Sequence, residues 1–323
     1  MTVAPVLRPE FDAELRAGLA VVGGMFPPTI TDDLIDFMRV SYASPPMDDV
    51  LRDRGIAREE HVAPGHLGDP IEVSVLRPPG QNGPRPAVVY AHSGGLMFGD
   101  RFSGIDLVLD WVDRMGAILV TVEYRLAPEF PDPYPREDMY AALEWTAAHA
   151  DALDIRTDRL VVAGASAGGG LAAGMALAAR DRGGPPLVGQ VLDYPMLDDR
   201  SALRADVAHP DTLTWTPQQN RFGWESYLRQ PAGQAETLPY AVPGRREDLT
   251  GLPPAWIGVG SLDLFYEENV AYADRLRRCG VACELVVVDG AFHGFDAFMD
   301  DVPACRDFLQ GQMEGLGRYL VGE

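Results

Sequence analysis

The chain has 323 residues, of which 46% are hydrophobic and 23% are charged. This length allows one large domain or two medium ones, and the composition excludes a disordered, fibrous or membrane-embedded chain. The 48 acidic residues against 27 basic ones give a net charge of −21, which repels phosphate backbones and anionic headgroups, so we expect neither nucleic acid nor a membrane as a partner.

The first 45 residues predict two amphipathic helices. The apolar residues of the first helix share one face, namely Leu15, Leu19 and Val22. The residue Thr31 is placed to cap the second helix, whose apolar positions are Leu34, Phe37 and Met38. This segment precedes every strand pattern in the chain.

From residue 56 onward, short apolar runs alternate with helical patterns. Strands are predicted at 71–76, 87–91, 118–122, 160–163, 188–192, 256–259 and 284–288, and helices near 137–149, 167–180, 269–279 and 302–320. This alternation is typical of a parallel sheet with crossover helices. We therefore predict one α/β domain that spans the chain.

Residues 199–254 interrupt this alternation. They contain several prolines and scattered aromatic residues but no clear strand, which indicates an insertion between two strands. The aromatic residues recur at helical spacing over 222–228, and this pattern predicts a short packed helix. The alternative interpretation is a cap over a pocket.

The basic residues and the cysteines restrict the chemistry and the compartment. Apart from histidine, every basic side chain is arginine, which excludes a P-loop lysine and a Schiff-base lysine. The three cysteines, Cys279, Cys283 and Cys305, lack the spacing of a disulfide framework. Residues 1–20 lack the apolar core of a signal peptide, and no apolar run reaches about 18 residues. We expect a cytoplasmic protein.

A candidate nucleophile follows the strand pattern at 160–163. The sequence Gly164-Ala165-Ser166-Ala167-Gly168 stands between that strand and a helical segment, which is the context of a G-x-S-x-G nucleophile elbow. Small flanking residues fit a tight turn that holds the Ser166 hydroxyl above the sheet edge. The alternative is the glycine-rich helix start of a dinucleotide-binding fold, but Ser166 replaces its middle glycine. We predict Ser166 as the nucleophile.

A serine nucleophile needs a base, and the base needs a carboxylate to orient it. Asp263 directly follows the strand pattern at 256–259, and His293 follows the one at 284–288, so both lie past strand carboxyl ends. The order Ser166, Asp263, His293 is that of an α/β-hydrolase, and we predict these three as the catalytic residues. The acids that compete with Asp263 are Asp289, Asp296, Asp300 and Asp301.

The loop after residues 87–91 offers donors for an oxyanion. It reads His92-Ser93-Gly94-Gly95, and we expect the amides of Gly94 and Gly95, with that of Ala167 after the nucleophile, to form the oxyanion hole. We interpret His92 as a structural residue that anchors the loop.

Together these motifs resemble those of the bacterial hormone-sensitive-lipase-like carboxylesterases (family IV), which carry an HGGG loop, a GDSAGG elbow, and DPLxDE and HGF segments. Supporting stretches are Tyr124-Arg125-Leu126-Ala127-Pro128-Glu129, Tyr194-Pro195, Gly251-Leu252-Pro253-Pro254 and His293-Gly294-Phe295. The resemblance covers most of the chain. It implies an α/β-hydrolase fold, a mostly parallel sheet flanked by helices with a helical cap. It also implies hydrolysis of short- to medium-chain carboxylic esters by a Ser-His-Asp triad.

The resemblance implies a division of the chain. Residues 1–45 are expected to be the N-terminal part of the cap, residues 46–198 and 255–323 the catalytic core, and residues 199–254 the cap insertion. Departures from the family pattern are Ser93, Leu96, Ala165 and Leu264-Phe265. We expect Leu96, Phe265 and Phe295 to line the substrate pocket.

The expected partner is a small-molecule ester, and the mechanism requires neither a cofactor nor a metal. The resemblance also suggests a homodimer through the last strand and helix. Two alternatives stay open: a hydrolase of another acyl bond, such as an amide, carbamate or lactone, and a non-catalytic small-molecule receptor on the same scaffold. The three intact triad residues argue against the receptor.

Overall fold

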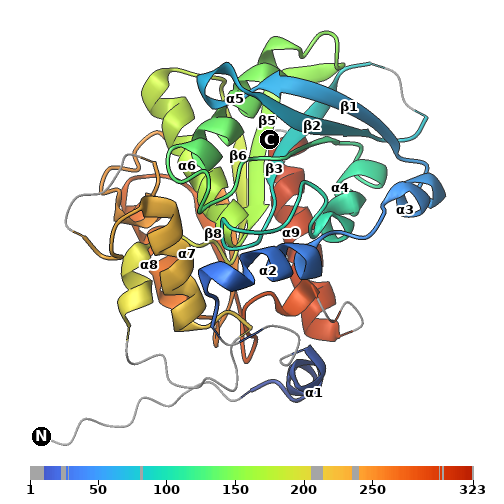
Figure 1. Cartoon of the computed structure of the whole chain (residues 1–323). Coiled ribbons are helices and arrows are strands. Elements are labelled where there is room, and N and C mark those ends of the chain that lie inside the picture. Colours follow the sequence, from blue (N-terminus) through green and yellow to red (C-terminus); the bar gives the residue numbers. More distant parts are fainter. Residues whose placement is uncertain are drawn as a thin grey trace, which may run out of the picture.

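A computed structural model describes residues 11–22, 27, 29–80, 83–204, 214–234, 240–297, 299 and 302–321. A single eight-stranded sheet runs through the described chain, with helices on both of its faces (Figure 1). The strand order is β1-β2-β4-β3-β5-β6-β7-β8. This arrangement confirms the predicted α/β class.

The strands fall where the apolar runs predicted them, with one addition at the N-terminal edge. They are β1 (Ala57–Pro64), β2 (Pro70–Arg77), β3 (Arg85–Ala91), β4 (Ile118–Val122), β5 (Ile155–Ala165), β6 (Gly189–Asp193), β7 (Ala255–Gly260) and β8 (Cys283–Val288). The sheet is parallel from β4 to β8, whereas β1 pairs with β2, and β2 with β4, in antiparallel fashion. The alternating burial of β1 shows why it gave no continuous apolar run.

The helices cover the two faces of the sheet. They are α1 (Ala13–Val22), α2 (Ile35–Tyr42), α3 (Asp48–Asp53), α4 (Leu109–Asp113), α5 (Tyr134–Ala148), α6 (Ala167–Arg182), α7 (Pro217–Leu228), α8 (Tyr266–Arg278) and α9 (Pro303–Val321). None of the described helices combines the length and the apolar character needed to span a bilayer.

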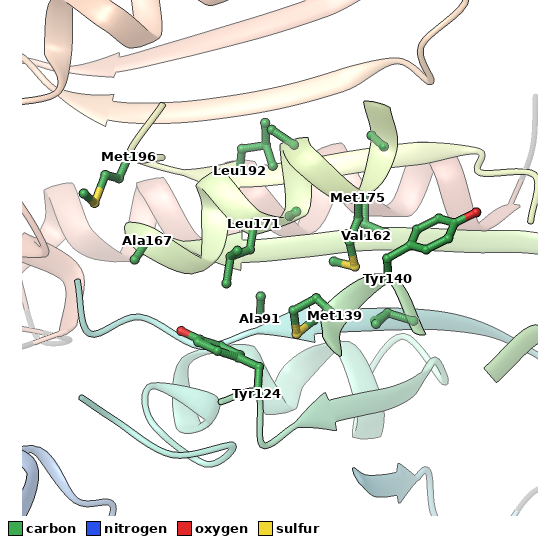
Figure 2. Close-up of a cluster of buried hydrophobic side chains, with 14 of the residues drawn as sticks. Ala91, Tyr124, Met139, Tyr140, Val162, Ala167, Leu171, Met175, Leu192 and Met196 are labelled. Atoms are coloured by element: carbon green, nitrogen blue, oxygen red, sulfur yellow. The ribbon is translucent and has the colours of Figure 1, made fainter. Parts of the chain in front are cut away.

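Neighbouring strand residues point to opposite faces and so build two cores. Val89 and Val162 face the core that contains α5 and α6, whereas Val88 and Val161 face the core that contains α4 and α9. Figure 2 shows part of the first core, including side chains of α5 and α6 around Val162. Because both faces are covered, the central strands read as continuous apolar runs.

The N-terminal helices differ from the prediction in detail. The residue Thr31 starts a 3₁₀ turn (Asp32–Leu34) without a side-chain cap bond, and its hydroxyl donates to Asp33 Oδ1 at 2.6 Å. On α2, Met38 is buried but Phe37 is 57% exposed, so the two predicted apolar positions do not share the buried face. Ile35 and Met38 lie three residues apart and together form that face. The side chain of Val22 lies outside the described residues.

The insertion contains the predicted short helix. The described part of residues 199–254 holds α7, which begins with a capping box between Thr216 and Gln219. In Figure 1, α7 and α2 lie at the same end of the molecule, and the Gln219 amide donates to the carbonyl of Pro27 at 2.7 Å. Residues 205–213 and 235–239 lie outside the described chain.

Candidate active site

The turn between β5 and α6 holds Ser166 in a strained backbone conformation. Its φ and ψ are 55° and −120°, a region that non-glycine residues rarely adopt. The Ser166 amide donates to the carbonyl of Asp193 at 2.9 Å, and its carbonyl accepts the amide of Met196 at 2.9 Å. These bonds to the chain after β6 keep the elbow in place.

The flanking glycines are required by close backbone contacts. A Cβ on Gly164 would lie 2.5 Å from the carbonyl of Gly168 and 2.7 Å from that of Ala91. A Cβ on Gly168 would lie 2.0 Å from the Ala91 oxygen. Because these atoms belong to backbone, no side-chain rotation relieves the clash. The G-x-S-x-G spacing is thus a packing requirement of the turn.

The three residues predicted as a triad lie together at the carboxyl ends of the strands. The Ser166 hydroxyl is 2.9 Å from His293 Nε2, and His293 Nδ1 is 2.8 Å from Asp263 Oδ2. The other oxygen of Asp263 accepts the amide of Phe265 at 2.8 Å, which fixes the carboxylate. All three side chains are buried. This geometry lets His293 accept the serine proton while Asp263 holds the imidazole.

The competing acids lie elsewhere. Asp289 accepts the hydroxyl of Ser261 on the surface, and Asp296 accepts the hydroxyl of Tyr194 at 2.8 Å. Asp300 and Asp301 lie outside the described residues. Among the described acids, Asp263 is the one that hydrogen bonds His293.

The predicted oxyanion donors belong to the loop after β3 and to the first turn of α6. The amides of Gly94, Gly95 and Ala167 have no acceptor within the part of the chain that the structure describes. A Cβ on Gly94, whose φ is +121°, would lie 1.9 Å from the carbonyl oxygen of Phe98. Gly94 therefore has to be glycine for this loop to close, and its free amide suits an oxyanion.

The residue His92 anchors that loop. It is 1% exposed, its Nδ1 is 2.7 Å from the carbonyl of Ser93, and its ring stacks on Tyr124 at a centroid distance of 4.1 Å. Burial lowers the pKa of His92 to about 4, so the ring stays neutral near pH 7. These contacts match the structural role that the sequence predicted for it.

A cavity of about 80 Å³ opens above Ser166 and His293. Its described walls come from α2, the insertion and the loops after β3, β6 and β8, with apolar contributions from Met38, Phe98 and Trp215. The Trp215 ring lies over Gly95, where a Cβ would be 2.4 Å from Cη2. These wall residues come from segments without a motif, so the sequence did not predict them.

The three residues predicted to line the pocket do not line this cavity. Leu96, Phe265 and Phe295 are buried in the two hydrophobic cores. Adjacent residues in a loop point in different directions, so a position next to a site residue does not itself face the site. Phe265 packs its ring edge-on against His293 at a centroid distance of 5.0 Å and so supports the imidazole.

A buried carboxyl lies directly beneath the nucleophile turn. Asp193 ends β6, and burial, with the nearby charge of Asp296, raises its pKa from 3.8 to about 8. The folded chain therefore keeps a proton on Asp193 that the unfolded chain releases. The contribution to the free energy of unfolding is complete below about pH 4 and is lost as the pH rises towards 8.

We expect Asp193→Asn to remove this pH dependence. Asparagine is neutral at every pH and still accepts the Gln312 amide that donates to Asp193 at 2.6 Å. The variant should melt above the wild type at pH 8, and the difference should narrow at pH 5, where Asp193 is neutral. Thermal melts at the two pH values test this. An equal difference at both would show that Asp193 is ionised in the folded chain throughout.

Known proteins resemble most of the chain, and one of them resembles nearly all of it. The family model for the α/β-hydrolase fold matches residues 88–297. A carboxylesterase of Mycobacterium tuberculosis, NlhH, is 34% identical, with 99% of each chain covered. An ethyl acetate hydrolase of Pseudomonas putida is 32% identical over 78% of this chain and 80% of its own.

Solved structures agree in fold. A bacterial heroin esterase superposes with a TM-score of 0.85 at 33% identity, covering 96% of this chain and 98% of its own. A hyperthermophilic esterase from the archaeon Pyrobaculum calidifontis superposes with a TM-score of 0.83 at 29% identity, covering 97% of this chain and 100% of its own.

Proposed function

Because this chain belongs to the α/β-hydrolase family, as one of its hormone-sensitive-lipase-like carboxylesterases, we propose that it hydrolyses esters through an acyl-enzyme on Ser166. That it is a carboxylic ester hydrolase follows from its relatives. The observation that carries the serine mechanism is the chain of short contacts from Ser166 through His293 to Asp263.

The mechanism has two halves. In the first, Ser166 Oγ attacks the ester carbonyl while His293 Nε2 takes its proton, and the amides of Gly94, Gly95 and Ala167 bind the oxyanion. The intermediate collapses when His293 gives the proton to the leaving alcohol. In the second half, water attacks the acyl-enzyme with His293 again as base, and the carboxylic acid leaves. Asp263 holds the imidazole in both halves.

We assign residues 1–45 and 199–254 to a cap over the core formed by residues 46–198 and 255–323. Support comes from the cavity, whose walls include Met38 of α2 and Trp215 of the insertion. Arg39 joins α2 to the core, since it pairs with Glu129 at 2.6 Å and donates to the carbonyl of Met97 at 3.0 Å. The cap thus closes over the nucleophile from two separate segments.

The cavity favours short to medium acyl chains. Its volume is about 80 Å³, and Met38, Phe98 and Trp215 give it an apolar wall that accepts methylene groups. One relative is named for hydrolysis of ethyl acetate, an ester with a short, two-carbon acyl group. Small esters are therefore the substrate class that we propose.

A graded series of p-nitrophenyl esters, from acetyl to dodecanoyl, tests the acyl preference. We expect kcat/KM to be greatest at short or medium length and to fall by about tenfold or more at the longest chain, since the wall leaves no room for it. The matched variant Met38→Ala should shift the optimum towards longer chains. A rate that rises steadily to dodecanoyl would contradict the pocket assignment.

Trapping with a serine-reactive phosphonate separates ester hydrolysis from other acyl chemistry. If Ser166 is labelled but esters turn over slowly, the machinery is active and the ester assignment is wrong. Amides, carbamates and lactones would then be tested with the same enzyme.

A further inference from the structure

A buried polar cluster lies beside His293. Its members are Asp193 and Tyr194 at the end of β6, Asp296 in the 3₁₀ turn Phe295–Ala297, and Gln312 of α9, and none is more than 4% exposed. The Tyr194 hydroxyl donates to Asp296 Oδ1 at 2.8 Å, and the Gln312 amide donates to Asp193 Oδ2 at 2.6 Å. The ester hydrolysis described above gives none of these four side chains a chemical step, although Tyr194 also lines the cavity above Ser166.

This cluster contacts two of the proposed catalytic residues. The Tyr194 ring meets the imidazole of His293 edge-on, with centroids 4.9 Å apart and an interplanar angle of 73°. The backbone carbonyl of Asp193 accepts the amide of Ser166. Since Phe265 packs on the imidazole as well, at 5.0 Å, the His293 ring is held by two aromatic rings in addition to Asp263.

The backbone at Tyr194 is strained. Its φ is +36°, a value that bulky residues rarely adopt, and its amide donates to the carbonyl of Gly258 at 2.6 Å. Such strain persists where surrounding contacts over-determine the conformation, and it concentrates at functional sites. The bond from Tyr194 to Asp296 is one of those contacts.

The cluster holds two carboxyl groups, and within the described residues neither is paired with an arginine. Burial raises the pKa of Asp296 to about 6, against the opposing effects of the Tyr194 hydrogen bond and the charge of His293. With the pKa of Asp193 at about 8, Asp193 is protonated near pH 7 and Asp296 is ionised. The other titratable groups that interact with the two carboxyl groups are Tyr90 of β3 and His293, and Cys305 of α9 donates to the neighbouring carbonyl of Phe295.

We propose that Asp296 is a positioning residue for His293: through Tyr194 it fixes the imidazole, and its buried carboxylate stabilises the imidazolium that forms when the Ser166 proton moves to Nε2. Asp296 neither gains nor loses a proton in this step, and it forms no bond to substrate. The inference rests on the proposed function, because it concerns the base of that same reaction.

Two carboxylates then act on one imidazole by different routes. Asp263 accepts the Nδ1 proton directly and sets the tautomer. Asp296 acts through the Tyr194 ring and through the low-dielectric interior, where a buried charge is felt over several ångströms. Removing Asp296 should therefore cost less activity than removing Asp263.

The test is the pH dependence of kcat/KM for a short p-nitrophenyl ester in Asp296→Asn. We expect the plateau to fall by about tenfold, because the imidazolium loses a stabilising charge. We also expect the acid limb to move to lower pH by about half a unit, since protonation of Asp296 near pH 6 no longer lowers the activity. The matched control is Asp289→Asn, an exposed acid in the same loop, whose profile should equal that of the wild type.

The variant Tyr194→Phe keeps the ring and removes the hydrogen bond, so it decides the question if Asp296→Asn does not fold. Without its donor, Asp296 protonates at a higher pH, and activity should be lost at a higher pH than in the wild type. If both variants fold and the acid limbs of their pH profiles match that of the wild type, the inference is wrong. Failure of the proposed function is distinct, because Ser166→Ala would then turn over the ester as fast as the wild type.

Discussion

Replacing Ser166 with alanine should lower kcat for a short p-nitrophenyl ester by about four to six orders of magnitude. The hydroxyl is the only atom that the change removes from the contact with His293 Nε2 at 2.9 Å. The amides of Gly94, Gly95 and Ala167 stay in place, so substrate still binds and KM should change little. Steady-state kinetics on the purified variant measure both quantities.

The control for this change is Ser41→Ala. The Ser41 hydroxyl lies on the exposed face of α2 and donates to the carbonyl of Phe37 at 2.8 Å, far from the motif residues in sequence. Its loss should leave kcat within about twofold of the wild type. If Ser166→Ala retained more than about a hundredth of the activity, a nucleophile other than Ser166 would have to carry the reaction.

Replacing Asp263 with asparagine should lower kcat by about three to four orders of magnitude, the second largest effect that we expect. The carboxylate accepts the Nδ1 proton of His293 at 2.8 Å and so leaves Nε2 free to receive the serine proton. An asparagine amide in that place donates to Nδ1 instead, which moves the ring proton to Nε2 and blocks the base. The single oxygen of that asparagine can still accept the Phe265 amide, so the fold should survive.

The control for the loss of charge is Asp289→Asn. Asp289 is exposed, stands four residues before His293, and accepts the Ser261 hydroxyl at 3.0 Å. Its activity should match that of the wild type. If Asp263→Asn folds and keeps more than about a tenth of wild-type kcat, another acid orients the imidazole. Asp296 would then be replaced together with Asp263 in a double variant.

The positions of most strands along the chain and the place of the nucleophile were predictable because their signals are local. A buried strand run such as 160–163, a tight glycine-flanked turn and a helical pattern follow one another directly in the chain. The parallel topology brings strand carboxyl ends to one edge, which explains why His293 meets Ser166 across 127 residues of chain and brings Asp263 with it.

The cavity wall was not predictable in the same way. Met38 and Trp215 come from segments whose placement depends on long-range contacts, such as the bond from Gln219 to the carbonyl of Pro27. The positions chosen instead, including Leu96 and Phe265, are neighbours of motif residues, and their side chains turn into the core. Sequence adjacency fixes the distance between two residues but not the direction of a side chain.

Two further features, the antiparallel edge of the sheet and the proposed role of Asp296, could not be predicted from the sequence either. The half-exposed strand β1 lacks the continuous apolar run that marks buried strands, so only its boundary with the N-terminal helices was visible. Asp296 looked like any acid near the last strand, and its burial against Tyr194 depends on the fold.

The suggested homodimer through β8 and α9 stays a prediction.

A covalent acyl-enzyme on Ser166 can be tested by covalent trapping of that residue. The enzyme is treated with a p-nitrophenyl phosphonate, the released nitrophenol is counted, and the labelled peptide is located by mass spectrometry. We expect one phosphonyl group per chain on Ser166 and loss of ester hydrolysis in proportion to labelling. A label on another residue, or full ester turnover by the labelled enzyme, would contradict it.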